Sequence, residues 1–115
     1  MMPRWINRAA DIVRPGRPYV EWASRLDDEA SEHAKGLEKR VSIYLVGEDP
    51  DEKEETAPLD RYYKKIFEAE LAALWTDRGD WPKERTLELF LQWFDVARES
   101  LVTDLESAPI KHENA

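Results

Sequence analysis

The residues of this chain that could carry out chemistry lie in patterns that fall short of a metal or catalytic site. Glu29 and His33 stand four residues apart, a spacing that lets both side chains reach one metal ion from a single helix. The chain has one other histidine, His112, and no cysteine, so no second pair of ligands completes the site. We therefore expect no metal site and an ion-paired or solvated Glu29–His33 pair.

The acidic run over residues 48–55 resembles a calcium loop only in composition. An EF-hand loop needs an oxygen ligand at the position of Lys53 and a glycine directly after it, where this chain has Glu54. Like charges in a run repel one another, so the segment is typical of a solvated loop. The four glycines form neither a dinucleotide-binding nor a P-loop motif, and we expect no cofactor.

Catalysis by a pair of carboxyl groups remains possible, because some of the 25 acidic residues must lie near one another in any fold. General acid–base catalysis needs a pocket that shifts the pKa of a carboxyl group. Asp95 and Asp104 flank the last apolar segment and are the best candidates, but positions at an element end explain them more simply.

The strongest candidate for a binding surface combines aromatic and arginine side chains. Such pairs contact anionic ligands, nucleobases or protein partners. The simpler interpretation is that the indoles fill the core and the arginines pair with the chain's own carboxylates. Trp22, Trp75 and Trp93 lie on apolar helical stripes and are expected in the core. The candidate binding residues are Trp5, Arg8, Arg14, Arg17 and Trp81, and Trp5 and Trp81 are the two tryptophans expected to face outward.

Composition predicts a single globular domain over residues 1–110 and a frayed tail over residues 111–115. The net charge of −8 argues against broad nucleic-acid binding, which requires neutralising phosphates. No apolar run reaches the roughly 20 residues of a membrane span, and the N-terminus lacks a signal-peptide pattern. These features, with the missing cysteines, favour the cytoplasm.

The periodicity of apolar residues predicts most elements. We expect strands over residues 6–14 and 41–46, and helices over residues 18–36 and 58–76. Asp80 is expected to cap a further helix, with Trp81-Pro82 in its first turn. Residues 83–106 keep a helical period throughout, yet the same sequence also suits a short helix ending near Trp93 and then a strand.

Several motifs together resemble a family of small uncharacterised bacterial proteins that has no established activity. They are Pro3–Ala9, Val13-Arg14-Pro15, Trp81-Pro82, Arg85-Thr86, Trp93-Phe94-Asp95, Asp104-Leu105 and Pro109-Ile110. The resemblance spans almost the whole chain and carries no catalytic residue across. It implies a strand at about residues 96–105. The fold expected on this basis is α+β in β-α-β-α-α-β order, with helices on one face of a small, mostly antiparallel sheet. A mainly α fold is the alternative.

Three functions are open at this point. The preferred hypothesis is a non-enzymatic protein-interaction or structural module that binds a partner or a second copy of itself. An acidic inhibitor or immunity-type protein that blocks a basic partner is the second. A small-molecule binder or carboxylate-based enzyme is the third.

Overall fold

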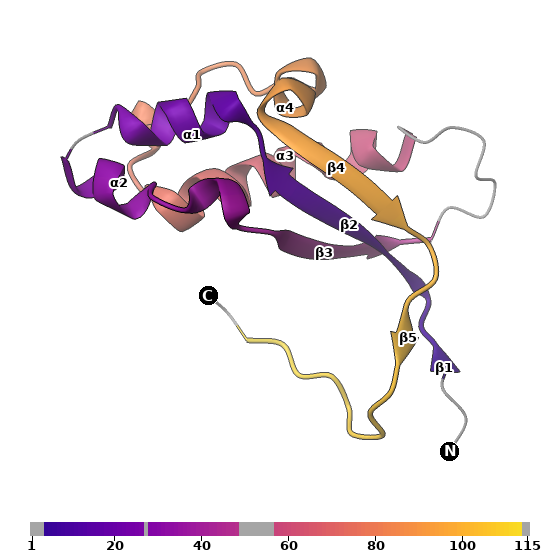
Figure 1. The fold of residues 1–115 in the computed structure, drawn as a ribbon. Coiled ribbons are helices and arrows are strands. Elements are labelled where there is room, and N and C mark those ends of the chain that lie inside the picture. The colour runs from indigo at the N-terminus through magenta and orange to yellow at the C-terminus, as the bar shows by residue number, and fades with distance from the viewer. Residues whose placement is uncertain (1–3, 27, 49–56, 114–115) are drawn as a thin grey trace.

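The computed structural model describes residues 4–26, 28–48 and 57–113. Its helices are short except for α3, and its strands are split between two sheets (Figure 1). In chain order the elements are β1 (Arg4–Trp5), β2 (Arg8–Pro15), α1 (Arg17–Ser24), α2 (Asp28–His33), the 3-10 turn η1 (Leu37–Lys39), β3 (Ser42–Gly47), α3 (Ala57–Leu74), the 3-10 turn η2 (Arg78–Asp80), α4 (Leu87–Trp93), β4 (Phe94–Glu99) and β5 (Thr103–Asp104).

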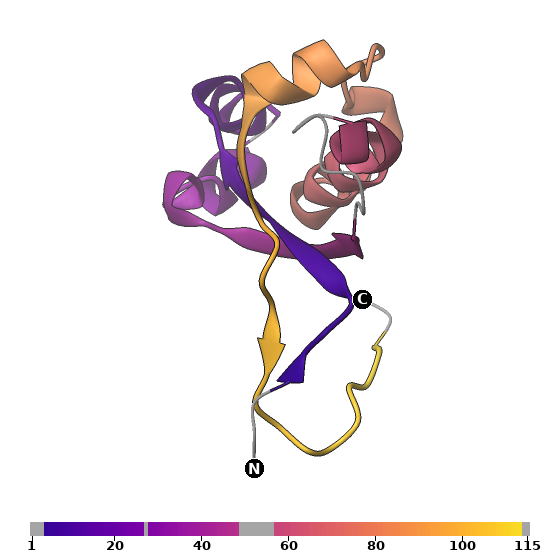
Figure 2. The ribbon, with the colours of Figure 1, turned by 90° about the vertical axis from the view of Figure 1, so that its right-hand side faces the viewer.

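The central sheet has the strand order β3-β2-β4, and both pairings are antiparallel. The helices gather on one side of this sheet, while β1 and β5 pair into a separate ribbon that projects away from it (Figure 2). The expected α+β fold, a small antiparallel sheet with helices on one face, is confirmed.

The segment after α4 is a strand, as the resemblance implied. The alternative of a single helix over residues 83–106 is wrong. Thr86 begins α4 by accepting a hydrogen bond from the Leu89 N–H at 3.1 Å, and the helix ends at Trp93. The apolar residues keep a helical spacing past Trp93, but the backbone after this residue forms a strand that pairs with β2. Phe94 lies opposite Pro15, and the Gly16 N–H donates to the Trp93 carbonyl at 2.7 Å.

Two helix boundaries differ from expectation. Asp80 belongs to η2 and Thr86 is the cap of α4, so Trp81-Pro82 lies outside the helix that it was expected to open. The helix expected over residues 18–36 is divided into α1 and α2. Its expected stop is present, since Gly36 has a φ of 79°, a left-handed conformation that favours glycine.

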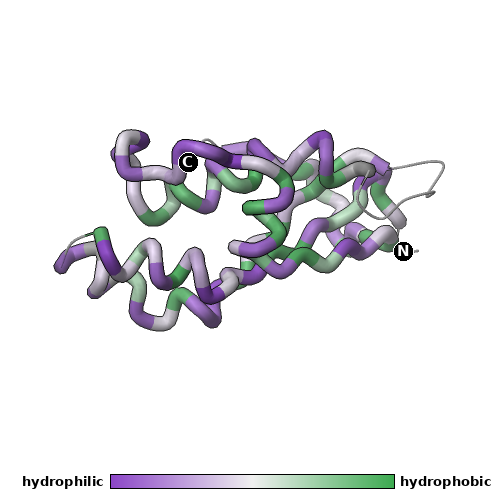
Figure 3. The backbone as a smooth tube through the Cα atoms, turned by 90° about the horizontal axis from the view of Figure 1, so that it is seen from above, coloured by the Kyte–Doolittle hydropathy of each residue, from purple (hydrophilic) through white to green (hydrophobic). Residues whose placement is uncertain are grey.

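The hydrophobic core lies between the helices and the sheet and is largely aromatic. Tyr19, Phe67, Phe90 and Phe94 are fully buried, and the Phe67 ring meets the Phe94 ring edge-on at 5.6 Å. Hydrophobic and hydrophilic residues alternate along much of the tube in Figure 3, as expected for elements that pack on one side. None of the described helices is long and apolar enough to cross a membrane.

Candidate functional site

The aromatic–arginine constellation expected near the N-terminus is not brought together. Trp5 lies in the β1–β5 ribbon and Arg17 lies on α1, with the eight residues of β2 between them. A strand of that length separates its ends by roughly 24 Å. Trp5 is 74% exposed, as expected, whereas Arg17 pairs with Glu21 of its own helix at 3.0 Å.

Trp81 is buried, so the expectation that it faces outward is wrong. Its side chain is 6% exposed, and its indole N–H donates to the Trp75 carbonyl at 2.8 Å. The guanidinium groups of Arg78 and Arg85 lie over its ring, 4.8 and 5.8 Å from the centroid. Trp81 therefore closes the turn between α3 and α4 instead of presenting a binding surface.

The other tryptophans stabilise the same end of the molecule. Trp22 and Trp93 pack against the core, with ring centroids 5.9 Å apart, as their helical stripes predicted. Trp75 is half-buried and donates its indole N–H to the Asp80 carboxylate at 2.9 Å. The Trp22 indole N–H donates to the Asp80 carbonyl at 3.0 Å, so one turn residue anchors both indoles.

The remaining sequence candidates for chemistry do not form a site. No group of three potential metal ligands occurs among the residues that the structure describes. Asp95 is exposed, and Asp104 accepts a hydrogen bond from the Glu106 N–H at 2.8 Å, as an element-end position does. The acidic run falls mainly on residues 49–56, outside the described part of the chain.

Two buried carboxylates were missed by the sequence analysis. Glu70 of α3 is 2% exposed, and its carboxylate accepts hydrogen bonds from the Tyr44 hydroxyl at 2.6 Å and the Ser42 hydroxyl at 3.0 Å. Its backbone carbonyl accepts from the Tyr19 hydroxyl. Burial, together with the nearby Glu70 carboxylate, raises the pKa values of both Tyr19 and Tyr44.

Asp11 of β2 is the second buried carboxylate and is fully enclosed. Arg98, opposite it on β4, donates two hydrogen bonds to its oxygens at 2.6 and 2.7 Å. Such a two-pronged pair holds both groups in fixed orientation. Because the oxygens of Asp11 and Glu70 are already bonded within the chain, both carboxylates act as structural groups. Asp11 joins β2 to β4 within the sheet, and Glu70 joins α3 to β3.

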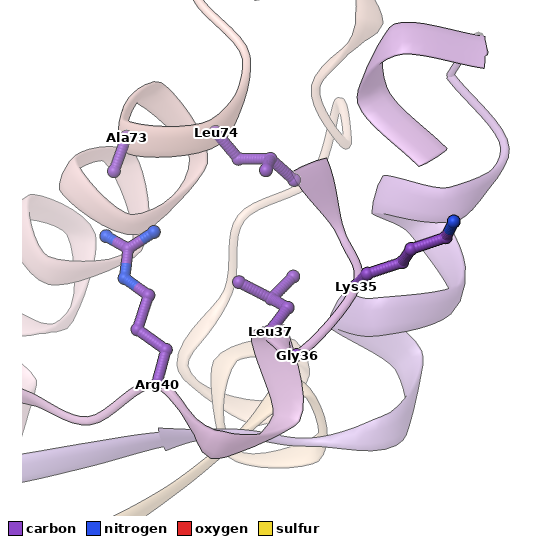
Figure 4. Close-up of a pocket in the computed structure, with 6 residues that line it drawn as sticks. All are labelled: Lys35, Gly36, Leu37, Arg40, Ala73 and Leu74. Carbon is purple, nitrogen blue, oxygen red and sulfur yellow. The ribbon is translucent and has the colours of Figure 1, made fainter. Parts of the chain in front are cut away.

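A hollow of about 410 Å³ lies between η1 and the end of α3, within the volume range of small-ligand sites. Arg40 reaches into it toward Ala73, and the side chains of Leu37 and Leu74 line it (Figure 4). Lys35 points away and pairs with Glu32 at 2.9 Å. Among the described residues that line it, the one cation that points into the hollow lies 3.9 Å from the Glu70 carboxylate, so the hollow lacks the several converging polar groups that orient a ligand.

The most unusual surface is the side of the central sheet that faces away from the helices, here called the open face. Ser42 and Tyr44 reach Glu70 on the helical side, so the alternate residues Ile43 and Leu45 point to the other side. Ile43 is 65% exposed and Leu45 is 50% exposed.

The open face extends across all three strands. Ile12 of β2 lies opposite Ile43 on one side and Ala97 on the other, and Ala10 lies opposite Leu45. Directly opposite residues share a face, so these side chains form one apolar patch, in which Ile43 and Leu45 are exposed and Ala10 is buried at 8%. By alternation along β2, Arg8 and Arg14 fall on the same face, at the two ends of the strand.

The sequence contained a signal for this face. A strand with one solvated side alternates apolar and polar residues, whereas residues 41–46 are apolar at nearly every position, a pattern typical of strands buried on both sides. In the structure the helices cover only the Ser42–Tyr44 side. The C-terminal residues 105–113 are exposed throughout and do not pack over the opposite side.

Comparison of the chain with known protein families, with curated proteins and with solved structures finds no match. The resemblance to a family of small bacterial proteins therefore stays a prediction.

Proposed function

We propose that this protein is a protein-interaction module without catalytic activity, and that the open face of its central sheet is the binding surface. The observation that carries the proposal is the outward position of Ile43 and Leu45, which are 65% and 50% exposed on a single strand. Contiguous exposed apolar patches of this kind mark interaction surfaces in soluble proteins.

The composition of the patch supports the same proposal. Ile12, Ala10 and Ala97 continue the apolar surface inward, while Arg14 and Asp95 lie opposite each other at its end. An apolar centre with a charged rim is the usual anatomy of a protein interface. Two of the arginines that the sequence nominated, Arg8 and Arg14, belong to this rim.

A photoreactive side chain at the centre of the face tests the proposal. We would place p-benzoylphenylalanine at Ile43 and, as a matched control, at Leu91 of α4, which is 45% exposed on the helical side of the molecule. Both variants are irradiated as purified protein and in an extract of the source cells.

We expect protein cross-links from position 43 and none above background from position 91. Cross-links of equal yield at both positions, or none from position 43 in either sample, contradict the proposal. The two samples also separate partners, because a product in purified protein can arise only from a second copy.

A further inference from the structure

The outer edge of β3 carries backbone groups whose identity follows from the ladder of the sheet. The Gly16 N–H turns toward the Trp93 carbonyl in the β4 direction. Hydrogen-bonding direction alternates along a strand, so Val13 and Asp11 of β2 turn toward β3. Their partners in β3 are Ser42 and Tyr44. The backbone N–H and C=O groups of Ser42 and Tyr44 therefore point toward β2.

By the same alternation, the N–H and C=O groups of Ile43 and Leu45 point away from β2, to the outer edge. An independent contact agrees with this assignment. Gly47, two residues beyond Leu45, donates its N–H outward to the Tyr62 hydroxyl at 3.0 Å. Within the part of the chain that the structure describes, no backbone hydrogen bond reaches Ile43 or Leu45 from outside the sheet.

The two edges of the sheet differ in how they are protected. Strand β4 carries Asp95, Arg98 and Glu99, and charged side chains discourage pairing with another strand. Strand β3 has the sequence SIYLVG, with neither charge nor proline. An uncharged apolar edge strand is a template for strand addition.

We propose that β3 pairs antiparallel with β3 of a second copy of this chain, in the register that places Tyr44 opposite its own counterpart. The inference rests on the proposed function and names its partner. In this register Ile43 lies opposite Leu45 of the second copy, so the outward backbone groups of both residues are hydrogen-bonded. The same pairing brings the two exposed side chains together on the open face.

Charge complementarity selects this register. Arg40 precedes β3 in extended conformation, and its side chain is 38% exposed with the guanidinium 3.9 Å from the Glu70 carboxylate. Glu48 follows the strand directly. With Tyr44 at the centre, Arg40 lies opposite Glu48 of the second copy, and the two-fold symmetry forms the pair twice. For the pairing to extend this far, the Tyr62 hydroxyl must leave the Gly47 N–H, because Val41 of the second copy lies opposite Gly47. A shift that pairs Ile43 with Ile43, or Leu45 with Leu45, moves each charge opposite a different residue and loses both pairs.

The pairing also joins the open faces. The two three-stranded sheets become one continuous sheet of six strands, with Ile43 and Leu45 at its centre on the face away from the helices. A two-fold contact of this kind is closed, because both copies use the same edge strand; of the two edges of the described central sheet, β3 is the uncharged one.

Register-specific disulfide formation tests the inference, since the chain has no cysteine of its own. The variants Ile43→Cys, Leu45→Cys and, as a surface control, Leu91→Cys are each oxidised alone and in pairwise mixtures with oxidised glutathione. In the proposed register positions 43 and 45 of different copies are hydrogen-bonded neighbours with Cα atoms about 5.5 Å apart. That lies within the range for a disulfide, whereas the diagonal 43–43 and 45–45 separations of about 7–8 Å exceed it.

We expect the mixture of Ile43→Cys and Leu45→Cys to give mainly the mixed 43–45 dimer, above either self-linked product and above the control. Predominance of the 43–43 or 45–45 product overturns the register, and yields no higher than those of Leu91→Cys overturn the pairing itself. If pairing fails while the photoreactive residue at position 43 still cross-links other proteins in extract, the proposed function survives without this partner.

Discussion

Removing the arginine from the buried Asp11–Arg98 pair should destabilise the protein far more than removing the aspartate. Asp11 is fully buried, and Arg98→Ala leaves its carboxylate enclosed without the two hydrogen bonds at 2.6 and 2.7 Å. A buried charge stripped of its partner costs about 3–5 kcal/mol. Asp11→Ala instead leaves Arg98, whose side chain is 23% exposed and can be solvated, at a cost of about 1–3 kcal/mol.

Urea unfolding followed by tryptophan fluorescence measures both variants, because the chain has five indoles. With a denaturant dependence of about 1–3 kcal/mol per molar urea, the loss in Arg98→Ala lowers the unfolding midpoint by about 2 M. The double variant Asp11→Ala/Arg98→Ala should be more stable than Arg98→Ala alone, because it removes the orphaned charge. Equal losses for the two single variants, or a double variant less stable than both, would refute the reasoning.

Three further predictions concern local features. Thr86→Ala removes the acceptor of the Leu89 N–H and should cost about 1 kcal/mol in urea unfolding, whereas Thr86→Ser should cost little; equal effects contradict the capping role. Gly36→Ala places a side chain at a φ of 79° and should lower the free energy of unfolding by about 1–2 kcal/mol. The cost is conformational, because no atom of the described residues, beyond the two chain neighbours of Gly36, lies within 4 Å of the added methyl group. Unchanged stability would contradict this. Burial raises the pKa values of Tyr19 and Tyr44 above the ordinary 10.0, so above pH 10 the folded state keeps protons that the unfolded state loses. The free energy of unfolding should therefore fall as pH rises above 10. Tyrosinate absorbance that rises fully before the protein unfolds would contradict this.

Much of the fold follows from local sequence signals. Pro15-Gly16 ends β2, the β-branched run over residues 41–46 forms β3, and Thr86 fits a cap although Asp80 was expected in that role. The segment after Trp93 could not be assigned from periodicity, because its apolar spacing suits a helix while its pairing partner, β2, lies some 80 residues earlier in the chain.

The candidate site was harder to predict, because exposure depends on tertiary packing. Trp81 beside Pro82 has the sequence of an exposed turn, but the turn folds back and two arginines cover the ring. Ile43 and Leu45 have the sequence of core residues, yet the helices select the opposite side of β3 through Glu70. That choice is made by a side chain on α3 and cannot be read from the strand itself.

Hydrogen exchange at the backbone amides of Ile43 and Leu45 tests the central claim most directly, because both N–H groups point to the outer edge of β3. The measurement is made by NMR from low micromolar to millimolar protein, with the amide of Glu106, held by Asp104 at 2.8 Å within one chain, as the internal reference. We predict that exchange at Ile43 and Leu45 slows as concentration rises while Glu106 is unchanged. Exchange at both amides that stays fast and independent of concentration would show that the edge of β3 does not pair with a second copy.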